Sequence, residues 1–312
     1  VAPMMGVTTP QARYLYRLIS KKVLLWSEMI AAQALHKGDV NKLLAKNDIE
    51  HPVVLQVGGS EIDLLKNSAA LAEEFQYNGI NLNVGCPSKK VSQGNMGACL
   101  MKESNLVKDC ISAMIQETSI HVSVKCRIGV DEFESYDFFK NFISTVAESG
   151  CDTFIIHARK AFLRGLDPKK NRTIPPLNYN FVYQIKKDFP DLKFIINGGF
   201  INLEDCLNQL NKVDGVMIGR AVQSNPFLLT EVDEIFYNQI PSEIDRLTIV
   251  KEYFDYIHSS FNHTSGYKLL SPLLAMCFGL PGSKKFKQDL NELIRTRDIA
   301  RLKETYINLL AA

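Results

Sequence analysis

The sequence predicts an α/β fold, a (β/α)8 TIM barrel followed by a small C-terminal helical domain. The length of 312 residues leaves room for a barrel of roughly 250 residues and one small addition. Short apolar runs rich in β-branched residues alternate with amphipathic stretches of helix length, which is typical of a parallel sheet. Hydrophobic residues form 46% of the chain and charged residues 22%, as in ordinary soluble globular proteins.

Eight short runs are predicted as barrel strands. A doubly wound sheet is the competing architecture, but it would usually carry a GxGxxG motif after its first strand, and this sequence has none. After about Pro241 the strand pattern stops, and residues 246–261 and 288–310 are predicted as helices around an irregular middle that contains Pro272. We therefore expect a barrel domain over residues 1–240 and a helical domain over residues 241–312. The eight runs centre on residues 1–4, 23–27, 53–57, 80–84, 121–125, 153–157, 194–197 and 216–218.

Charge and cysteine content limit the classes of function. The net charge of +2 is small for a protein that binds nucleic acid over a wide surface, so any RNA site must be local. Seven cysteines without a CxxC pair argue against a disulfide framework or a zinc site, and we expect no bound metal. No apolar run approaches the roughly 20 residues of a membrane span, and the first residues lack the layout of a secretory signal. We therefore expect a cytoplasmic protein that does not bind membranes. As a separate expectation, the protein is a monomer.

Several predicted strands end in a polar residue. In a TIM barrel, the catalytic and cofactor-binding groups lie at the carboxyl ends of the strands. One such residue would most often belong to a loop only, but seven at seven strand ends predict a shared site at the mouth of the barrel. The seven residues are Glu28, Gln56, Asn83, Lys125, His157, Asn197 and Arg220.

Glycine-rich turns follow the last two predicted strands. Asn197 precedes Gly198 and Gly199, and Gly219 precedes Arg220. Glycines let backbone N–H groups approach a phosphate, and an arginine adds a charge-assisted hydrogen bond. The turns therefore favour a phosphorylated cofactor or substrate. The alternative is that the glycines only form tight turns between strand and helix.

Lys125 and His157 end successive predicted strands. A buried lysine needs an anionic or electron-rich partner, and a flavin supplies one because its N1–C2=O edge gains negative charge on reduction. Together with Gln56, these residues indicate a cofactor site. Each residue alone would be unremarkable, since a single histidine is more often structural.

The segment LNVGCPS places Cys86 in a turn after the fourth predicted strand. A thiol can act there as a nucleophile, a general acid or a metal ligand. Metal binding is disfavoured because no second cysteine or histidine lies nearby at ligand spacing. We interpret Cys86 as the best candidate for a general acid, and a buried packing cysteine is the alternative.

The run HARKAFLRGLDPKKNR, from His157 to Arg172, holds six basic residues and a single acidic one, Asp167. Such a run beside a barrel mouth can bind a phosphodiester backbone with an affinity that falls with salt. A solvated loop is the alternative. Seven basic residues between positions 284 and 303 form a second, weaker basic segment in the predicted helical domain.

These motifs together resemble the tRNA-dihydrouridine synthases, and most closely the bacterial A-type, which acts on D-loop uridines 20 and 20a. The resemblance runs along nearly the whole chain. LNVGCPS with HARK and NGG is typical of the family, and the run from HARKA to IPPL is typical of the A-type. The chain departs from the A-type pattern in its first loop, MMGVTTPQAR, and in SPLLAMCFGLPG, which lacks a basic pair just before GLPG.

The resemblance implies FMN as cofactor, NADPH as reductant and tRNA as substrate. It also implies that the flavin passes a hydride to C6 of a flipped-out uridine while Cys86 protonates C5, and that the helical domain holds the tRNA. The positions that match tRNA contacts are Asn83, Lys169 and Arg172, with Arg127 as a further candidate beside the substrate base. The positions that match the FMN site are Pro3, Met4, Gln56, Lys125, His157, Asn197, Gly198, Gly199, Gly219 and Arg220.

Two other functions compete with this interpretation. A metabolic FMN barrel of the dihydroorotate dehydrogenase type would reduce or oxidise a free pyrimidine, and it would not need the basic run. A non-catalytic RNA-binding protein, built on a barrel that has lost its enzymatic activity, would also have lost its cofactor residues. Cys86, Lys125 and His157 are all present in this sequence.

Overall fold

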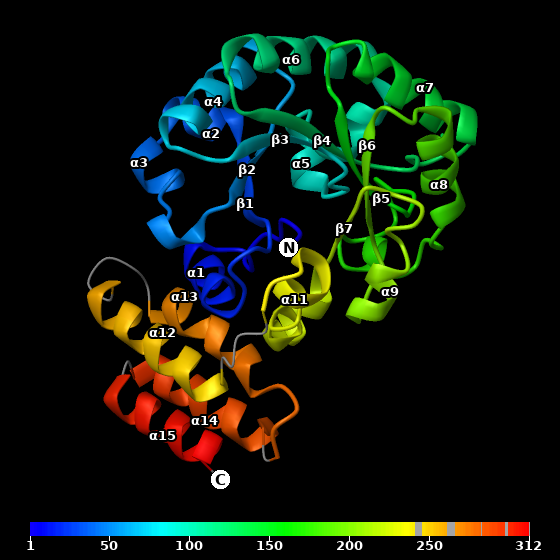
Figure 1. The fold of residues 1–312 in the computed structure, drawn as a ribbon. Coiled ribbons are helices and arrows are strands. Elements are labelled where there is room, and N and C mark those ends of the chain that lie inside the picture. The colour runs from blue at the N-terminus through cyan, green and yellow to red at the C-terminus, as the bar shows by residue number, and fades with distance from the viewer. Residues whose placement is uncertain (241–244, 261–265, 282, 297–298, 312) are drawn as a thin grey trace.

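The computed structural model contains seven parallel strands that curl into a barrel surrounded by helices (Figure 1). The structure describes residues 1–240, 245–260, 266–281, 283–296 and 299–311. Each strand pairs in parallel with the next one along the chain. The strands are β1 (Leu25–Ala31), β2 (Val53–Gly58), β3 (Gly79–Val84), β4 (His121–Arg127), β5 (Thr153–His157), β6 (Lys193–Asn197) and β7 (Gly215–Met217).

Seven of the eight predicted strands are confirmed, and the first prediction is wrong. Residues 1–4 form no regular strand. They nevertheless lie between β7 and β1, because the Ala2 N–H donates to the Ile218 carbonyl at 2.7 Å and the Val1 amine donates to the Leu24 carbonyl at 2.7 Å. One hydrogen bond to each neighbour closes the barrel without a ladder. This segment therefore takes the place of the eighth strand.

Helices cover the outside of the barrel and alternate with the strands along the chain, as predicted from the sequence. Helix α1 is capped by Thr9, whose hydroxyl accepts from the Ala12 N–H. Helix α7 is capped by Ser135 and buries an apolar face of Phe139, Phe142, Ile143 and Val146 at helical spacing. The helices of this part are α1 (Pro10–Ile19), α2 (Ala32–Lys37), α3 (Val40–Leu43), α4 (Ile62–Glu74), α5 (Lys89–Gln93), α6 (Ser104–Glu117), α7 (Tyr136–Ala147), α8 (Tyr179–Asp188), α9 (Leu203–Leu207), α10 (Arg220–Ser224) and α11 (Val232–Tyr237), with 3-10 turns η1 (Asp48–Glu50), η2 (Gly97–Lys102), η3 (Lys170–Arg172) and η4 (Pro226–Leu229).

The C-terminal part is helical, as predicted. It consists of α12 (Arg246–Ser260), α13 (Gly266–Leu270), η5 (Ser271–Cys277), α14 (Ser283–Thr296) and α15 (Ile299–Ala311). The single helix predicted over residues 288–310 is wrong, because α14 and α15 pack against each other, and residues 297–298 lie outside the described residues. The rings of Phe286 and Tyr306 have their centres 4.9 Å apart. One straight helix would separate these positions by about 30 Å, so α14 and α15 are two helices that lie side by side.

The helical part packs beside α1 (Figure 1). Tyr14 of α1 stacks on Tyr256 of α12 with ring centres 3.8 Å apart. The Arg246 guanidinium lies 4.2 Å from the centre of the Phe227 ring in η4. The predicted boundary after residue 240 stays a prediction, since residues 241–244 lie outside the described residues.

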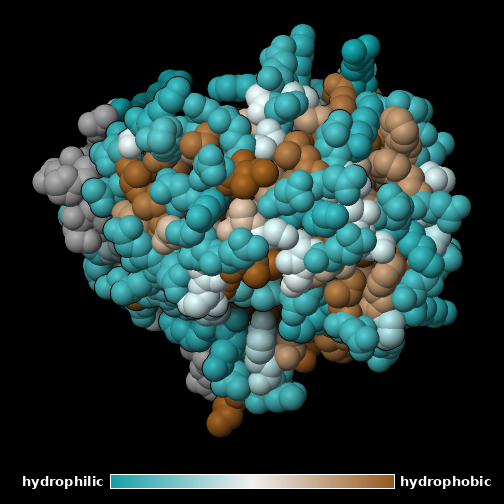
Figure 2. All heavy atoms as spheres, turned by 90° about the horizontal axis from the view of Figure 1, so that it is seen from above, coloured by the Kyte–Doolittle hydropathy of each residue, from teal (hydrophilic) through white to brown (hydrophobic). Residues whose placement is uncertain are grey.

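On the face in Figure 2, hydrophobic side chains form small patches that hydrophilic side chains separate. Among the described residues, no helix is both long enough and apolar enough to cross a membrane.

Candidate active site

A cavity of about 1180 Å³ occupies the carboxyl end of the barrel. All seven strands contribute to its wall, as the sequence predicts for a barrel mouth. Glu28 is the exception among the polar strand ends. A bulge between Trp26 and Met29 turns it away, so that Met29 lines the cavity while Glu28 accepts from the Gly6 N–H at 2.5 Å. The predicted residues that line the cavity are Pro3, Met4, Gln56, Asn83, Cys86, Lys125, Arg127, His157, Arg172, Asn197, Gly198, Gly199, Gly219 and Arg220.

A row of neutral polar side chains runs across β4, β3 and β2 toward the cavity. Asn81 donates to Ser123 at 3.0 Å and accepts from Gln56 at 2.8 Å. Gln56 in turn accepts from the Asn83 amide at 2.9 Å. All four side chains are buried, and such groups are stable inside a protein only when they are paired. The row therefore fixes the orientation of Asn83 at the end of β3.

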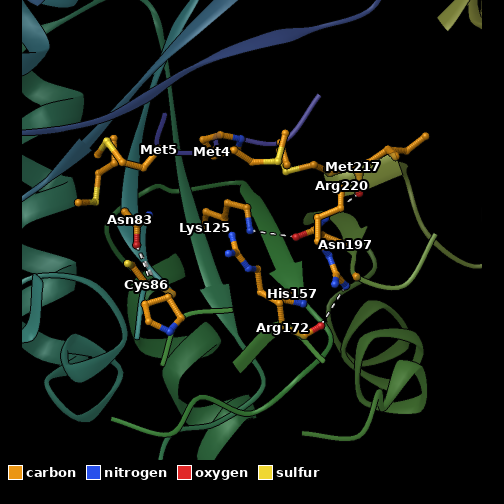
Figure 3. Close-up of a pocket in the computed structure, with 18 of the residues that line it drawn as sticks. Met4, Met5, Asn83, Cys86, Lys125, His157, Arg172, Asn197, Met217 and Arg220 are labelled. Atoms are coloured by element: carbon orange, nitrogen blue, oxygen red, sulfur yellow. Dashed lines mark hydrogen bonds between the residues drawn. The ribbon is translucent and has the colours of Figure 1, made fainter. Parts of the chain in front are cut away.

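Asn83 in turn fixes the loop that carries Cys86. Its side-chain oxygen accepts from the Gly85 N–H at 3.1 Å and from the Cys86 N–H at 2.9 Å. The Cys86 carbonyl accepts from the Ala98 N–H at 2.9 Å, which ties the same loop to η2. Figure 3 shows Asn83 and Cys86 together on one side of Lys125. The thiol is half-buried and lines the cavity.

Lys125 lies opposite this loop, on the side of β6 and β7. Its ammonium donates to the Asn197 side-chain oxygen at 3.1 Å, and Asn197 donates to the Met217 carbonyl at 2.7 Å (Figure 3). Burial, together with the nearby positive charge of Arg127, lowers the pKa of Lys125 to about 8. The side chain is thus held in place with a positive charge that an anion would stabilise.

The cavity is electropositive. Five cationic side chains line it, and none of the described residues in its wall is an aspartate or a glutamate. His157 adds no charge at neutral pH, because burial and the neighbouring Arg127 and Lys125 hold its pKa well below its ordinary value. Such a cavity favours an anionic ligand. The cationic residues are Lys90, Lys125, Arg127, Arg172 and Arg220.

The turn after β6 needs glycine. Gly198 has φ +115°, and a Cβ added there would lie 2.7 Å from Cδ2 of His157. The backbone of this turn therefore lies directly beside the imidazole. The turn after β7 is close to the first residues of the chain, since a Cβ on Gly219 would lie 3.4 Å from Ala2. Backbone from three segments thus converges on one side of the cavity.

The sequence model of the dihydrouridine synthases matches residues 1–310 of this chain. The chain belongs to the dihydrouridine synthase family. The tRNA-dihydrouridine(20/20a) synthase of Yersinia pestis is 44% identical over 295 residues, which cover 94% of this chain and 85% of the relative. The enzyme of the same name from Vibrio vulnificus is 46% identical over 297 residues, which cover 94% and 90%. These similarities confirm the resemblance that the motifs indicate.

A solved structure supports the fold. The structure of morphinone reductase in complex with tetrahydroNAD is similar with a TM-score of 0.55, covering 80% of this chain and 89% of that chain. The sequence identity is 12%, so this similarity shows the barrel fold alone.

In this dihydrouridine synthase, the basic run after β5 is an ordered loop. Asn171 is buried and donates to the carbonyls of Phe162 and Leu166 at 2.9 and 3.1 Å, while its oxygen accepts from the Phe162 N–H at 2.8 Å. The carbonyl of Arg172 accepts from the Arg220 guanidinium at 3.0 Å. Arg172 is half-buried and lines the cavity, whereas Lys169 is exposed and does not.

Arg127 has a different environment from the one the sequence suggests. It is buried, and its guanidinium donates to the carbonyls of Gly85, Lys160 and Asn171 at 2.9, 3.1 and 3.0 Å. Burial lowers its pKa to about 10, so it stays protonated at neutral pH. In the structure, Arg127 therefore joins the loop of Cys86 to the basic loop.

Several cavity residues of this dihydrouridine synthase are missing from the sequence prediction. Met29, Lys90 and Phe278 line the wall, and Asn81 supports it from below. Only Asn81 carries a signal in the sequence, because it is polar in the middle of an apolar strand. Among the described residues, no group of three or more histidine, cysteine, aspartate or glutamate side chains could hold a metal ion.

Proposed function

We propose that this chain is a tRNA-dihydrouridine synthase that reduces a D-loop uridine at position 20 or 20a, with FMN as its cofactor and NADPH as its reductant. Family membership and the names of its relatives support the activity and the substrate. The observation that carries the proposal is the cavity itself, where one thiol, Cys86, lies across from the buried cation of Lys125.

The residues present fit FMN. The cavity exceeds the roughly 300 to 1000 Å³ of common ligand sites, which leaves room for a flavin and a pyrimidine together. The turns at Gly198 and Gly219, with Arg220, suit its phosphate, and Lys125 suits the edge of the ring that becomes negative on reduction. Pro3, Met4, Gln56, His157, Asn197 and Gly199 would form the remaining contacts.

FMN, once reduced by NADPH, would supply the hydride for C6 of the uracil. The protein supplies the proton for C5 from the Cys86 thiol, which then regains a proton from solvent. The hydrogen bonds of Asn83 and Ala98 hold this thiol at a fixed place in the wall. Lys125 keeps a positive charge on the opposite side, where it favours an anionic ring over a neutral one.

The substrate base must leave the RNA stack to enter this cavity. Arg172 at the rim and Lys169 on the surface of the basic loop would contact the phosphates beside it, and the helical part over residues 241–312 would hold the rest of the tRNA. Asn83 and Arg127 would act mainly by fixing the loops around the base, because their polar groups are engaged within the protein.

The test begins with the purified protein and its visible spectrum. The protein is then incubated with NADPH and unmodified tRNA, and dihydrouridine is located by nuclease mapping and mass spectrometry. Flavin absorbance together with new dihydrouridine in the D-loop is the expected result. Oxidation of NADPH without any change in the tRNA would instead point to a metabolic barrel that acts on a free pyrimidine.

Cys86→Ala tests the proton donor. The variant should keep its flavin and its oxidation of NADPH but lose dihydrouridine formation by roughly a hundredfold or more, since general acids contribute about that much. Cys99→Ala is the matched control, because Cys99 is also half-buried but does not line the cavity. Normal turnover in the Cys86 variant would remove this thiol from the mechanism.

A further inference from the structure

The helical part contributes one side chain to the cavity wall. Phe278 follows η5, and among the described residues after position 245 it is the only one that lines the cavity. The residue is 48% exposed, although an aromatic ring of this size is usually buried. A ring held half-open at the rim of a binding cavity can receive the flat face of a ligand.

Arg246 fixes Phe278 relative to the barrel. Its guanidinium donates to the Phe278 carbonyl at 3.0 Å and packs on the ring of Phe227 in η4, with 4.2 Å between the guanidinium carbon and the ring centre. One side chain of α12 thus binds both the barrel and the loop that carries Phe278. The position of the ring at the rim is therefore set by the contact between the barrel and the helical part.

The neighbouring segment of the barrel offers polar and apolar groups on the same wall. Asn225 immediately precedes η4, and Leu228 lies within it. Both residues line the cavity. The side-chain oxygen of Asn225 is buried and has no hydrogen-bond partner in the part of the chain that the structure describes. An unpaired buried acceptor is unfavourable, and rotation of the amide toward the cavity would let this oxygen accept from a ligand N–H.

An aromatic ring, an apolar side chain and a hydrogen-bond acceptor on one wall are the groups that bind a nucleobase. The target uridine itself would lie deeper, between Cys86 and Lys125. When that base leaves its stack, the adjacent nucleotide loses a stacking partner. Phe278 lies at the outer rim, where this adjacent base would be exposed.

We propose that Phe278 stacks on the base of a tRNA nucleotide next to the target uridine and that Asn225 accepts a hydrogen bond from the same base. The inference rests on the proposed function and adds to it a residue of the helical part that places the RNA. It makes Phe278 a positioning residue, and Arg246 the side chain that holds it.

The first test compares Phe278→Ala with the wild-type enzyme. The KM for tRNA should rise about 5- to 150-fold, which is the range measured when a stacking aromatic is removed from a single-strand site. Flavin content, NADPH oxidation without tRNA and kcat should change little. Phe278→Trp should restore the KM, because it keeps the stack. Tyr237→Ala is the control, since Tyr237 is 43% exposed and lines a separate cavity at the amino end of the barrel.

The second test uses tRNA transcripts in which the nucleotide on either side of the target uridine lacks its base. The penalty of Phe278→Ala should disappear on one of these transcripts, because the stack is already absent there. A full penalty on both transcripts, or a KM for tRNA equal to that of wild type, would overturn the inference. A rise in the KM for NADPH alone would also overturn it, because the wall would then bind the dinucleotide.

The outcome for the proposed function is separate. If the wild-type protein forms no dihydrouridine, the proposed function fails before any variant is compared. If the wild-type protein is active and both Phe278→Ala and Phe278→Leu match it, only the further inference fails. Phe278→Leu keeps the apolar volume, so it covers the case in which the alanine variant does not fold.

Discussion

Gly97→Ala should displace Cys86 while leaving the cofactor side of the cavity unchanged. Gly97 has φ +78°, and an added Cβ would lie 2.5 Å from the Cys86 carbonyl oxygen and 2.8 Å from a methyl of Val91. An ordinary contact begins near 3.4 Å, so the backbone around Cys86 must move by most of an ångström. A shift of about 1 Å at a reacting group can reduce its rate about a hundredfold.

The left-handed backbone adds a cost that must be separated from this contact. A non-glycine residue in such a conformation costs about 1 to 2 kcal/mol of folding free energy. Gly150→Ala is the matched control, because Gly150 has φ +92° but a Cβ there meets only Ile115, at 3.8 Å. Both variants should lose the stability that the left-handed backbone costs, and Gly97→Ala should lose more because its Cβ also meets the Cys86 carbonyl. Gly97→Ala alone should lose activity.

The assay measures dihydrouridine in tRNA after single turnover, flavin absorbance and the free energy of unfolding for each variant. We expect normal flavin content in both variants and a 10- to 100-fold slower turnover in Gly97→Ala, an estimate of about this order from the displacement. If Gly97→Ala turned over at the rate of Gly150→Ala, the close packing of η2 on the Cys86 loop would not matter for catalysis.

Two other predictions concern the charged groups. Lys125 has its pKa lowered to about 8, so it carries a positive charge below that pH and loses it above. The affinity of the apoprotein for FMN should therefore fall between pH 7 and pH 9. The Lys125→Met variant should bind FMN more weakly than wild type at pH 7, and its affinity should not change with pH. Fluorescence titration measures both, and a wild-type affinity that does not change with pH would contradict the assignment. Arg172→Ala should weaken tRNA binding and reduce the slope of log affinity against log salt by about 1. Filter binding of tRNA between low and moderate salt measures this slope. Lys212→Ala is the control, because Lys212 lies on the outside of the barrel, where it packs on the Tyr183 ring. An unchanged slope in Arg172→Ala would place Arg172 away from the phosphates.

The strand ends were predictable because a barrel imposes a strong rule on them. A polar residue that ends an apolar run must face either solvent or a shared site. Seven such residues at seven strand ends favour a shared site at the mouth of the barrel. Glu28 shows the limit of this rule. The bulge in β1 changes which side chain faces the cavity. No residue type in the run from Trp26 to Met29 predicts a bulge there.

The supporting contacts were much less predictable. Arginine is a residue type that often binds RNA, yet the guanidinium of Arg127 donates hydrogen bonds to three backbone carbonyls of the protein itself. Asn171 lies in a basic run that suggests a solvated surface, and it is buried at the centre of its loop. Both roles depend on the path of the backbone in three dimensions, which residue type and spacing do not specify.

Phe278 was unpredictable for a related reason. Its place in the cavity depends on Arg246, 32 positions away, and on Phe227, a further 19 positions back. No local pattern connects an aromatic residue in a loop of the helical part to a site at the ends of barrel strands. The contact arises only when the helical part docks beside α1.

The two sides of the cavity are built by different physical means, and this explains why they should fail separately. The Cys86 side depends on neutral hydrogen bonds that pass from Ser123 through Asn81 and Gln56 to Asn83, so a substitution on the neighbouring strand β4 can move the thiol. The opposite side depends on buried positive charge, which a bound anion stabilises and which is costly without one. Loss of the first should leave a flavoprotein that cannot protonate its substrate, and loss of the second should leave a protein that cannot keep its flavin.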